Sequence, residues 1–543
     1  MTETASRPDR SSSDPPPPRG ARIVAAVRAV RPSWWLGAWA VLGVAAVAVL
    51  CSVDVLPFYD YYLWLFQGHV VGALLFGAAP GPAVLGRAYF LSAVPVPNLA
   101  APLAIGLLNA WLPVEAAGRV FAILTVLGFA GAFGFLARTL QRRRTWVELT
   151  GFVWAFGFFL EKGYHSYLFG LALAFVLVAV LHRVVRRDRP PSRAYWLLGG
   201  LGTALYLSHL IAWSIGALAV VVHAAVLVRG GRRGEAWRLG ATLLPGVVML
   251  GWYTIAERGG SGLAFYTSWT NKAISLVEPL LAFLRLDPFP PPFPVFWANV
   301  GVALVVGALV VNQMRWADVR TALSTRPVLW LSGALAAIAL VMPIAELNEL
   351  IKPDERFVLP AALLALAALP WRSLRRGAGT AVVGLVAAVI GLHAVEYTAV
   401  ARRIAPVDVA TDAFVPAGSR VLELAIASRD GCTPAPGVTI GVPTLKWFGV
   451  DHVLETGGAV VALDETSIVH ARPDAGPPNL TALTPTSAAE ATTAALTATP
   501  PASSVLLVAC ANDLDAVTGD LSSVYVPVAR GEGFALLSRR AGG

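Results

Sequence analysis

The sequence predicts a polytopic α-helical membrane protein with about eleven transmembrane helices, followed by a C-terminal extracytoplasmic α/β domain. The first observation is composition: 56% of the 543 residues are hydrophobic, 14% are charged, and the mean hydropathy is +0.65. A soluble protein of this length could not keep so much apolar surface away from water. Secondly, apolar runs of membrane-spanning length alternate with short arginine-rich connections. Thirdly, short alternating stretches replace the long apolar runs after about residue 400.

The N-terminal part sets the expected orientation. Residues 1–32 are rich in Ser, Pro and Arg and have no apolar periodicity, which is typical of a disordered, basic cytoplasmic tail. The following run, Trp34–Val53, is long enough to cross about 30 Å of hydrocarbon at 1.5 Å per residue. This run is too long for a signal peptide and lacks a small-residue cleavage site. We therefore expect residues 54–115 to form an outer loop.

This outer loop contains two candidate catalytic carboxylates, Asp54 and Asp60, just beyond the first span. An ionisable group at a membrane surface is a functional-site hypothesis by default. For Asp54 the alternative is that it ends a helix at the water boundary, whereas the aromatic residues around Asp60 favour a functional role. Within the loop, Tyr61–Phe76 and Leu99–Trp111 are predicted to be helices that lie along the outer surface.

Ten further apolar runs follow the outer loop. The expected spans are Ala116–Leu140, Trp146–Leu160, Tyr167–Val185, Tyr195–Leu207, Ile211–Val228, Leu239–Ile255, Val295–Val311, Val328–Ala345, Phe357–Leu369 and Ala378 to about Val400. The arginine-rich connections begin at Arg142, Arg183, Arg229, Arg315 and Arg372. All five fall on the side of the basic tail, while the opposite connections are mixed or acidic. The positive-inside rule therefore predicts a cytoplasmic N-terminus and an extracytoplasmic C-terminus.

These arginine clusters also account for the net charge of +9. In a soluble domain that charge would suggest nucleic acid as a partner. Here the arginines fall between apolar spans, where they orient the protein and contact anionic lipid headgroups. We therefore expect membrane lipids as partners and no nucleic acid.

Residues 401–543 are expected to form the small α/β domain with short strands in RVLEL, GVTIGV, SSVLLVAC and SSVYVPVA. The stretch AEATTAALTATPPA is either a short helix or a loop. Cys432 and Cys510 can form a disulfide if this domain lies outside the cytoplasm; the alternative is two unrelated buried thiols. The sequence has no Cys/His spacing of the zinc-binding kind.

The predicted topology collects most acid–base groups on the outer side. Acid–base chemistry needs carboxylates or imidazoles that converge in a partly dry cleft. Besides the two aspartates, the candidate substrate-binding residues are His69, Arg87, Glu161, His165, His209, Lys352 and Arg356. Asp354 and Glu355 also lie on this side.

Three of these candidates have alternative interpretations. His209 lies at the end of a span and is either functional or an ordinary interfacial histidine. Glu161 and His165 are four residues apart, as metal ligands on a helix can be, but no third ligand accompanies them in the sequence. Arg356 suits bidentate contact with phosphate oxygens, or is a snorkelling arginine or half of an Arg–Glu surface pair.

The order of these features resembles the GT-C superfamily of integral-membrane glycosyltransferases, which use lipid-phosphate-linked sugars. The resemblance covers residues 35–400 and rests on an acidic residue after the first span, on surface helices, and on a proline-containing entry into an amphipathic helix. The stretches VPVPNLAAPLAIGLLNAWLPVEAAGRVFAILTVLGFAGAFGFLART, GYHSYLFGLALAFVLVAVL and DERFVLPAALLALAAL are similar to segments of that family. This chain has Asp60-Tyr61 where many members have two acidic residues, and Val96-Pro97-Asn98 where His-Pro-Pro is common.

The resemblance implies an enzyme of the bacterial inner membrane that moves a sugar from a polyprenyl-phosphate donor to an extracytoplasmic glycan, lipid or protein. Asp60, less well Asp54, would be the general base. Arg356, with Lys352, would stabilise the leaving phosphate. His209, Glu161 and His165 would line the cleft. The reaction allows a divalent cation, Mg²⁺ or Mn²⁺, without requiring one.

Two other function classes stay open. A lipid or glycan transporter or flippase would carry charges near the middle of its spans and show internal repeats. The spans here hold almost no ionisable groups except His223 and His393, and no repeat is visible, which favours the enzyme. A non-catalytic cell-envelope assembly protein is the third class.

Overall fold

The computed structural model describes residues 34–54, 56–58, 60–79, 81–256, 263–264, 269–281, 293–342, 344–345, 353–373, 376–416, 419–426, 469–472, 480–483, 485, 487–499, 501–509, 511–531 and 533–540. The expected N-terminal tail, Lys352, Cys432, Cys510 and the GVTIGV stretch lie outside these residues.

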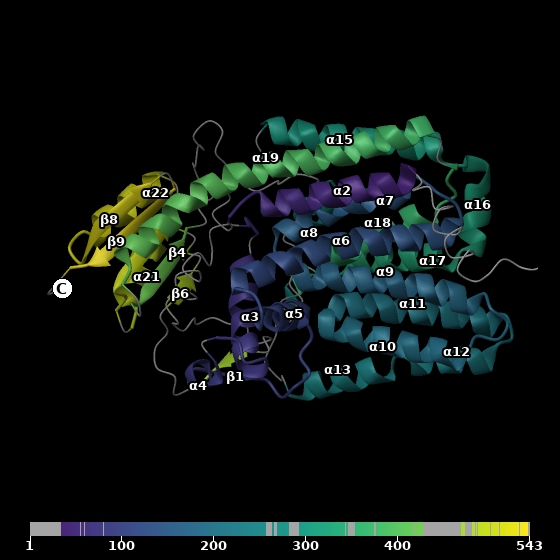
Figure 1. The fold of residues 1–543 in the computed structure, drawn as a ribbon, viewed down its shortest axis with the longest axis horizontal. Helices are drawn as coiled ribbons and strands as arrows, with labels where there is room; N and C mark the ends of the chain where they lie inside the picture. Colours follow the sequence, from purple (N-terminus) through teal and green to yellow (C-terminus); the bar gives the residue numbers. More distant parts are fainter. Residues whose placement is uncertain are drawn as a thin grey trace, which may run out of the picture.

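Helices dominate the N-terminal three quarters of the chain (Figure 1). In chain order they are α2 (Trp34–Cys51), α3 (Tyr61–Leu75), α4 (Pro82–Leu85), α5 (Ala100–Asn109), α6 (Val114–Gln141), α7 (Val147–Ala155), α8 (Phe158–Glu161), α9 (His165–Val185), α10 (Ser192–Ser208), α11 (Leu210–Arg229), α12 (Arg233–Ala241), α13 (Leu244–Ala256), α14 (Trp269–Leu281), α15 (Phe293–Gln313), α16 (Trp316–Thr325), α17 (Pro327–Val341), α18 (Pro353–Ala368) and α19 (Arg376–Phe414).

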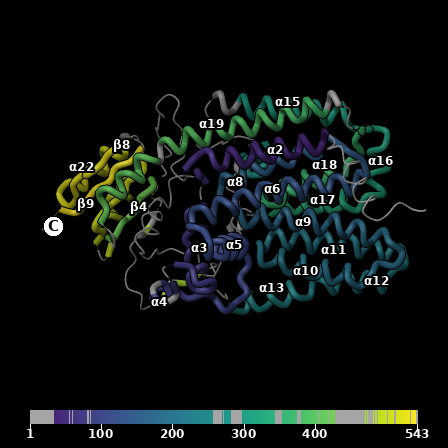
Figure 2. Tube along the Cα trace, in the orientation of Figure 1, coloured from purple at the N-terminus to yellow at the C-terminus, as the bar shows by residue number. Residues whose placement is uncertain are grey.

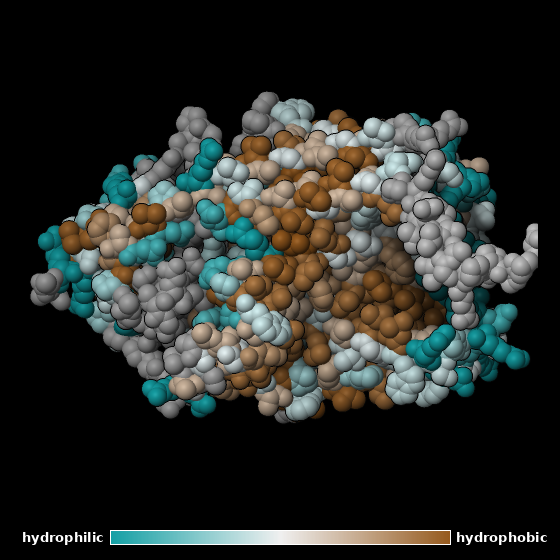
Figure 3. All heavy atoms as spheres, in the orientation of Figure 1, coloured by the Kyte–Doolittle hydropathy of each residue, from teal (hydrophilic) through white to brown (hydrophobic). Residues whose placement is uncertain are grey.

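Several of these helices are long and apolar enough to cross a membrane. Among the described residues, five helices meet that test alone, and up to seven spans result if each of two bent pairs, α12 with α13 and α16 with α17, is one span. The chain is therefore a multi-pass membrane protein, and the figure of eleven spans stays a prediction. On the face drawn in Figure 3, apolar residues gather across the middle of the molecule and hydrophilic residues lie toward both ends.

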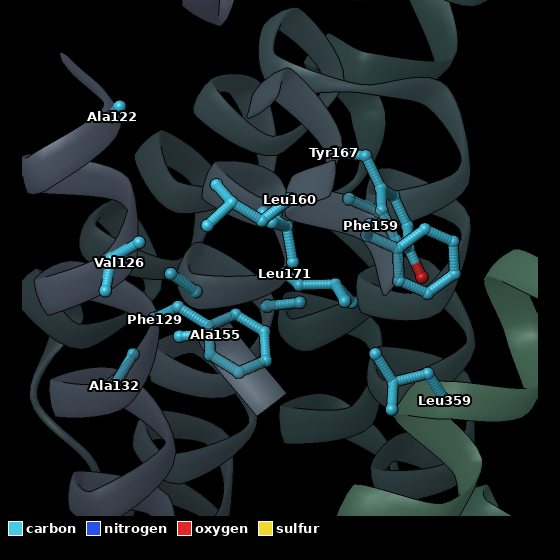
Figure 4. Close-up of a cluster of buried hydrophobic side chains, with 14 of the residues drawn as sticks. Ala122, Val126, Phe129, Ala132, Ala155, Phe159, Leu160, Tyr167, Leu171 and Leu359 are labelled. Atoms are coloured by element: carbon cyan, nitrogen blue, oxygen red, sulfur yellow. The ribbon is translucent and has the colours of Figure 1, made fainter. Parts of the chain in front are cut away.

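The interior of the bundle is packed with aliphatic and aromatic side chains (Figure 4). Ala122, Val126, Phe129 and Ala132 line one face of α6 opposite Leu171 of α9, and all five are buried. Lipid tails are as apolar as these side chains, so close van der Waals packing rather than the hydrophobic effect holds such helices together.

The third expected span differs from the observed structure. Trp146–Leu160 is divided into α7 and α8, and the chain bends between them at Phe156 and Gly157. A continuous helix and a broken helix that is buried have the same apolar composition. The sequence therefore does not show which of the two forms here. Glu161 ends α8, four residues before α9 begins at His165.

The two helices of the outer loop form where the sequence predicts them, but α3 is not a surface helix. Most of its residues are buried, and it packs against α5 and α6. Hydrogen bonds fasten the loop to the bundle: Leu99 N donates to Leu207 O (2.7 Å), and Ala101 N donates to Ser166 Oγ (3.0 Å). The loop is thus part of the core at this end.

The arginine-rich connections meet at the opposite end. Arg232 Nη1 donates to the Val185 carbonyl (2.7 Å), which joins the connection after α11 to the end of α9. Arg315 N donates to Pro370 O (2.8 Å), which joins the connection after α15 to the end of α18. Figure 1 shows α12 and α16 at this end, far from the C-terminal sheet. Which end is cytoplasmic stays a prediction.

The longest helix, α19, does not end near Val400 but continues to Phe414. It runs beside α2 and reaches the C-terminal sheet, where it contacts two strands, β8 (Tyr525–Gly531) and β9 (Phe534–Arg539) (Figure 2). The helix α19 therefore runs without interruption across the boundary between the two domains that the sequence predicts at residues 400 and 401.

The C-terminal sheet has five strands in the order β6-β4-β7-β9-β8. Its elements are β4 (Val421–Ala425), β6 (Leu480–Leu483), β7 (Ser504–Val508), β8 (Tyr525–Gly531) and β9 (Phe534–Arg539), with α21 (Ala488–Thr497) and α22 (Ala511–Leu521). Strands β4, β7 and β8 coincide with three of the stretches predicted as strands, and AEATTAALTATPPA contains most of the helix α21. β4 is parallel to β6 and β7, whereas β9 is antiparallel to β7 and β8.

Two pairs of short strands lie outside this sheet. β1 (Tyr89–Leu91) pairs antiparallel with β5 (Val469–Ala471), and β2 (Leu263–Ala264) pairs with β3 (Ile344–Ala345). The first pair links the outer loop to the C-terminal region, so both regions belong to the same end of the molecule.

Candidate active site

The turn between α8 and α9 is the centre of the site. Gly163 has a φ of +76°, the left-handed region that favours glycine. A Cβ atom at Gly163 would lie 2.5 Å from Asp60 N, so the backbone of Asp60 rests directly against this turn. Trp64 Nε1 donates to Gly163 O (2.8 Å) and fixes the start of α3 there. Asp60 itself is half-buried and precedes α3.

Arg356, near the start of α18, lies against the same turn. Its guanidinium carbon is 4.4 Å from the centre of the Tyr164 ring, and Nη1 is 3.3 Å from His209 Nε2. The Tyr167 hydroxyl donates to the Arg356 carbonyl. Arg356 is only 7% exposed. An arginine held against an aromatic ring keeps its planar fork of donors in a fixed orientation.

His209 reaches Arg356 because the chain breaks between α10 and α11 at this residue. The backbone of His209 is extended, and its Nδ1 accepts a hydrogen bond from Ile211 N (3.2 Å), which caps α11. The ring packs on Tyr167 with centroids 5.2 Å apart. The sequence prediction that this residue lies at a helix end is therefore correct, and the ring is buried.

A buried ion pair lies beside Arg356. Lys272 Nζ, on α14, is 2.8 Å from Asp354 Oδ2, and Ser275 Oγ donates to the same oxygen (3.0 Å). Ser275 Oγ also lies 3.3 Å from Glu355 Oε1. Asp354 and Glu355 are 0% and 1% exposed. Charged groups this deeply buried at the end of a membrane bundle are costly and mark functional sites by default.

Glu161 belongs to a third cluster. His393 Nδ1, on α19, lies 3.4 Å from Glu161 Oε1 and 3.4 Å from Glu396 Oε2. Within the part of the chain that the structure describes, these three residues form the group whose donor atoms could hold a metal ion. Glu161 therefore pairs with α19 and not with His165, the partner considered from the sequence.

His165 lies instead among aromatic rings. Its ring centroid is 5.3 Å from that of Phe58, 5.8 Å from that of Tyr61 and 6.4 Å from that of Phe121. Phe58 and Tyr61 lie on either side of Asp60 in the sequence, so His165 contributes to the aromatic surroundings of that segment.

The remaining candidates lie away from this centre. Asp54 is exposed, and its carbonyl accepts a hydrogen bond from Arg119. His69 lies on α3, about two and a half helical turns beyond Asp60; burial lowers the pKa of this half-buried histidine. Arg87 is exposed in the turn before β1. The structure thus brings the segments of Asp60 and Arg356 together, with His165, His209 and Glu161 near them.

A second group of charges lines a cavity of about 480 Å³ at the opposite end of the bundle. Its lining residues are Arg138, Thr139, Arg142, His182, Arg183, Arg186 and Arg187. These are the ends of α6 and α9, where the sequence predicts contact with anionic headgroups. This cavity is separate from the cluster around Gly163.

Sequence reasoning did not find Lys272, Ser275 or Glu396. Lys272 and Ser275 fall between the expected spans Leu239–Ile255 and Val295–Val311, where part of the chain forms the helix α14. Glu396 and His393 have a visible signal, because residues three apart share one face of a helix. A histidine and a glutamate at that spacing inside an apolar span stand out from their neighbours.

No protein-family model matches this sequence, and no curated protein matches it. Among solved structures, the chain is similar to ArnT from Cupriavidus metallidurans in a crystal structure of the apo state, with a TM-score of 0.43 and 12% sequence identity. The alignment covers 95% of this chain and 98% of that chain.

Proposed function

We propose that this chain is a membrane glycosyltransferase of the GT-C type that transfers a sugar from a polyprenyl-phosphate donor to an acceptor outside the cytoplasm. The observation that carries the proposal is the meeting of two distant segments at one turn. The backbone of Asp60 lies against Gly163, and the guanidinium of Arg356 lies over the next residue, Tyr164. The segment that bears the Asp60 carboxylate therefore meets the buried Arg356 at this turn.

Asp60 is the general base in this proposal. Its carboxylate takes the proton of the acceptor hydroxyl while the acceptor oxygen forms a bond to the anomeric carbon. The bond from that carbon to the phosphate oxygen breaks, and polyprenyl phosphate leaves with the electron pair. The configuration at the anomeric carbon is inverted. General-base assistance of this kind contributes about 10²–10⁴-fold to the rate.

Arg356 binds the phosphate of the donor and stabilises the negative charge that grows on it as the bond breaks. A guanidinium is always charged and makes two parallel hydrogen bonds to phosphate oxygens, so it suits this role. The aromatic ring of Tyr164 and the imidazole of His209 hold the guanidinium in position beforehand. Such preorganisation is usually the largest contribution to catalysis of charge-separating reactions.

The ion pair of Lys272 with Asp354 anchors the start of α18, on which Arg356 lies. Lys352, just before this helix in the sequence, is a second candidate for the phosphate. The lipid tail of the donor would lie in the membrane beside the apolar helices. The sugar, the acceptor class and the bacterial inner membrane as the location are part of the proposal.

The test is transfer of label from polyprenyl-phosphate sugars by the purified full-length protein in lipid nanodiscs. The wild type should remove label from the lipid, and Asp60→Asn should lose about 10²-fold or more of that rate, as expected for a general base. Glu115→Gln is the matched control, because Glu115 is an exposed carboxylate at the start of α6.

Wild-type rates in Asp60→Asn would remove Asp60 from the mechanism. Movement of intact donor lipid across the bilayer without loss of label would favour the flippase alternative. Donors with different sugars, offered singly, identify the substrate in the same experiment.

A further inference from the structure

The cluster of Glu161, His393 and Glu396 joins the turn at the centre of the site to the last long helix. Glu161 ends α8, and His393 and Glu396 are three residues apart on α19. His393 is fully buried, whereas the Glu161 and Glu396 side chains are 10% and 19% exposed. Solvent therefore does not reach the imidazole, but it reaches the cluster beside Glu396.

Hydrogen bonding alone does not explain this arrangement. Two carboxylate oxygens face the same nitrogen, His393 Nδ1, at 3.4 Å each. A ring nitrogen carries one proton at most and donates it along one direction. Charge-assisted N–H···O bonds are shorter, about 2.7–2.9 Å. Two carboxylates brought together in a buried place repel each other unless a positive charge, an imidazolium or a metal ion, lies between them. His393 Nδ1 has no hydrogen-bond partner among the described residues, which favours the metal ion.

A shared metal ion explains these distances. Two ligand atoms at the tetrahedral angle, each about 2.1 Å from one ion, are about 3.4 Å apart, and zinc binds protein nitrogen and oxygen at about 2.0–2.2 Å. The two observed separations have this value, and all three donor atoms lie within 4.8 Å of one another.

The ligand set also selects among metals. Octahedral coordination with the same separation would require bonds of about 2.4 Å, longer than the roughly 2.0–2.1 Å of Mg²⁺. Ca²⁺ accepts that length but takes oxygen ligands. An imidazole with two carboxylates suits Zn²⁺, and three protein ligands leave one position for water or for an oxygen of another molecule.

We propose that Glu161, His393 and Glu396 form a zinc site that ties α8 to α19. Glu161 lies two residues before Gly163, so the ion fixes the turn against which Asp60 and Arg356 rest. Metal binding tests this zinc site separately from the transfer reaction.

The test measures metal content and heat stability of the full-length protein. The protein is purified in detergent, stripped with a chelator, loaded with Zn²⁺ and freed of excess metal. Wild type should retain about one zinc ion per chain, as a site with three protein ligands predicts. His393→Gln and Glu396→Gln should retain less than about a tenth of that amount, because each removes one ligand. Zn²⁺ should raise the melting temperature of the wild type and leave that of Glu396→Gln unchanged.

His223→Gln is the matched control. His223 is as buried as His393, but it contacts the Ala219 carbonyl within α11 and lies outside the cluster. This variant should bind zinc like the wild type. Zinc retained by His393→Gln, or none bound by correctly folded wild type, would overturn the site. Zinc binding without sugar transfer would overturn only the proposed function, and sugar transfer without zinc binding only this site.

Discussion

Gly163 is the residue on which the geometry of the site depends most. Its φ of +76° lets the chain reverse between α8 and α9 within a few residues. Its missing side chain makes room for the backbone of Asp60. Because Tyr164 follows directly and supports Arg356, a shift of this turn would move both the carboxylate and the guanidinium.

Gly163→Ala should therefore reduce both stability and sugar transfer. The left-handed backbone costs a non-glycine residue about 1–3 kcal/mol, and the added Cβ would collide with Asp60 N at 2.5 Å. Thermal unfolding in detergent and the label-transfer assay measure the two effects.

Gly77→Ala separates backbone strain from the collision. Gly77 has a similar φ of +72°, but nothing lies within 4 Å of the position of its Cβ. This variant should lower stability without the loss of transfer. Equal transfer by the two variants would contradict the role of Gly163.

At the scale of elements, the contact between α14 and α18 decides whether Arg356 is presented to the site. Lys272 of α14 reaches across to Asp354 and to the Met342 carbonyl (2.7 Å). Both charges are buried, so removing one partner leaves the other in a medium that does not solvate it.

Lys272→Met should destabilise the protein by about 3–5 kcal/mol, as breaking a buried pair does. The double variant Lys272→Met/Asp354→Asn should recover part of the loss, because no unpaired charge remains. Thermal unfolding in detergent gives both values. The control is Arg315→Met: Arg315 pairs with Asp318 in an exposed position, which is worth about 0–1 kcal/mol. If Lys272→Met lowers the stability as little as Arg315→Met does, the buried pair does not hold α18 in place.

The helices show how far the sequence determines this fold. Apolar length predicts α2, α6, α9 and α11 to within a few residues, because a membrane leaves a long apolar run few alternatives. The same signal misses the bend between α7 and α8. It also fails to show that α3 is buried, because α3 packs against protein where an exposed outer surface was expected.

The site was predictable only in part for a related reason. Asp60, Glu161, His209 and Arg356 stand out as charged or titratable residues at the ends of apolar runs. Their partners come from distant elements, and which elements meet depends on packing. No periodicity in the sequence signals that Lys272 reaches Asp354.

At the scale of the whole molecule, the two ends of the bundle differ in chemistry. The outer loop, the cluster around Gly163 and the C-terminal sheet occupy one end, and the arginine-rich connections occupy the other (Figure 1). The positive-inside rule predicts that the arginine-rich end faces the cytoplasm.

Single-cysteine labelling in intact cells tests this orientation. With the three native cysteines replaced by serine, Glu115→Cys at the start of α6 should react with a membrane-impermeant maleimide. Asp188→Cys, in the exposed connection after α9, should react only after the cells are permeabilised. The reverse pattern would put the proposed site in the cytoplasm.

The most direct measurement is a structure of the full-length protein with polyprenyl phosphate bound. We expect the phosphate oxygens within hydrogen-bond distance of the Arg356 guanidinium, on the side of the bundle that holds Asp60. A phosphate bound instead in the arginine-lined cavity at the opposite end, with Arg356 still covered by Tyr164 and His209, would contradict the proposed site.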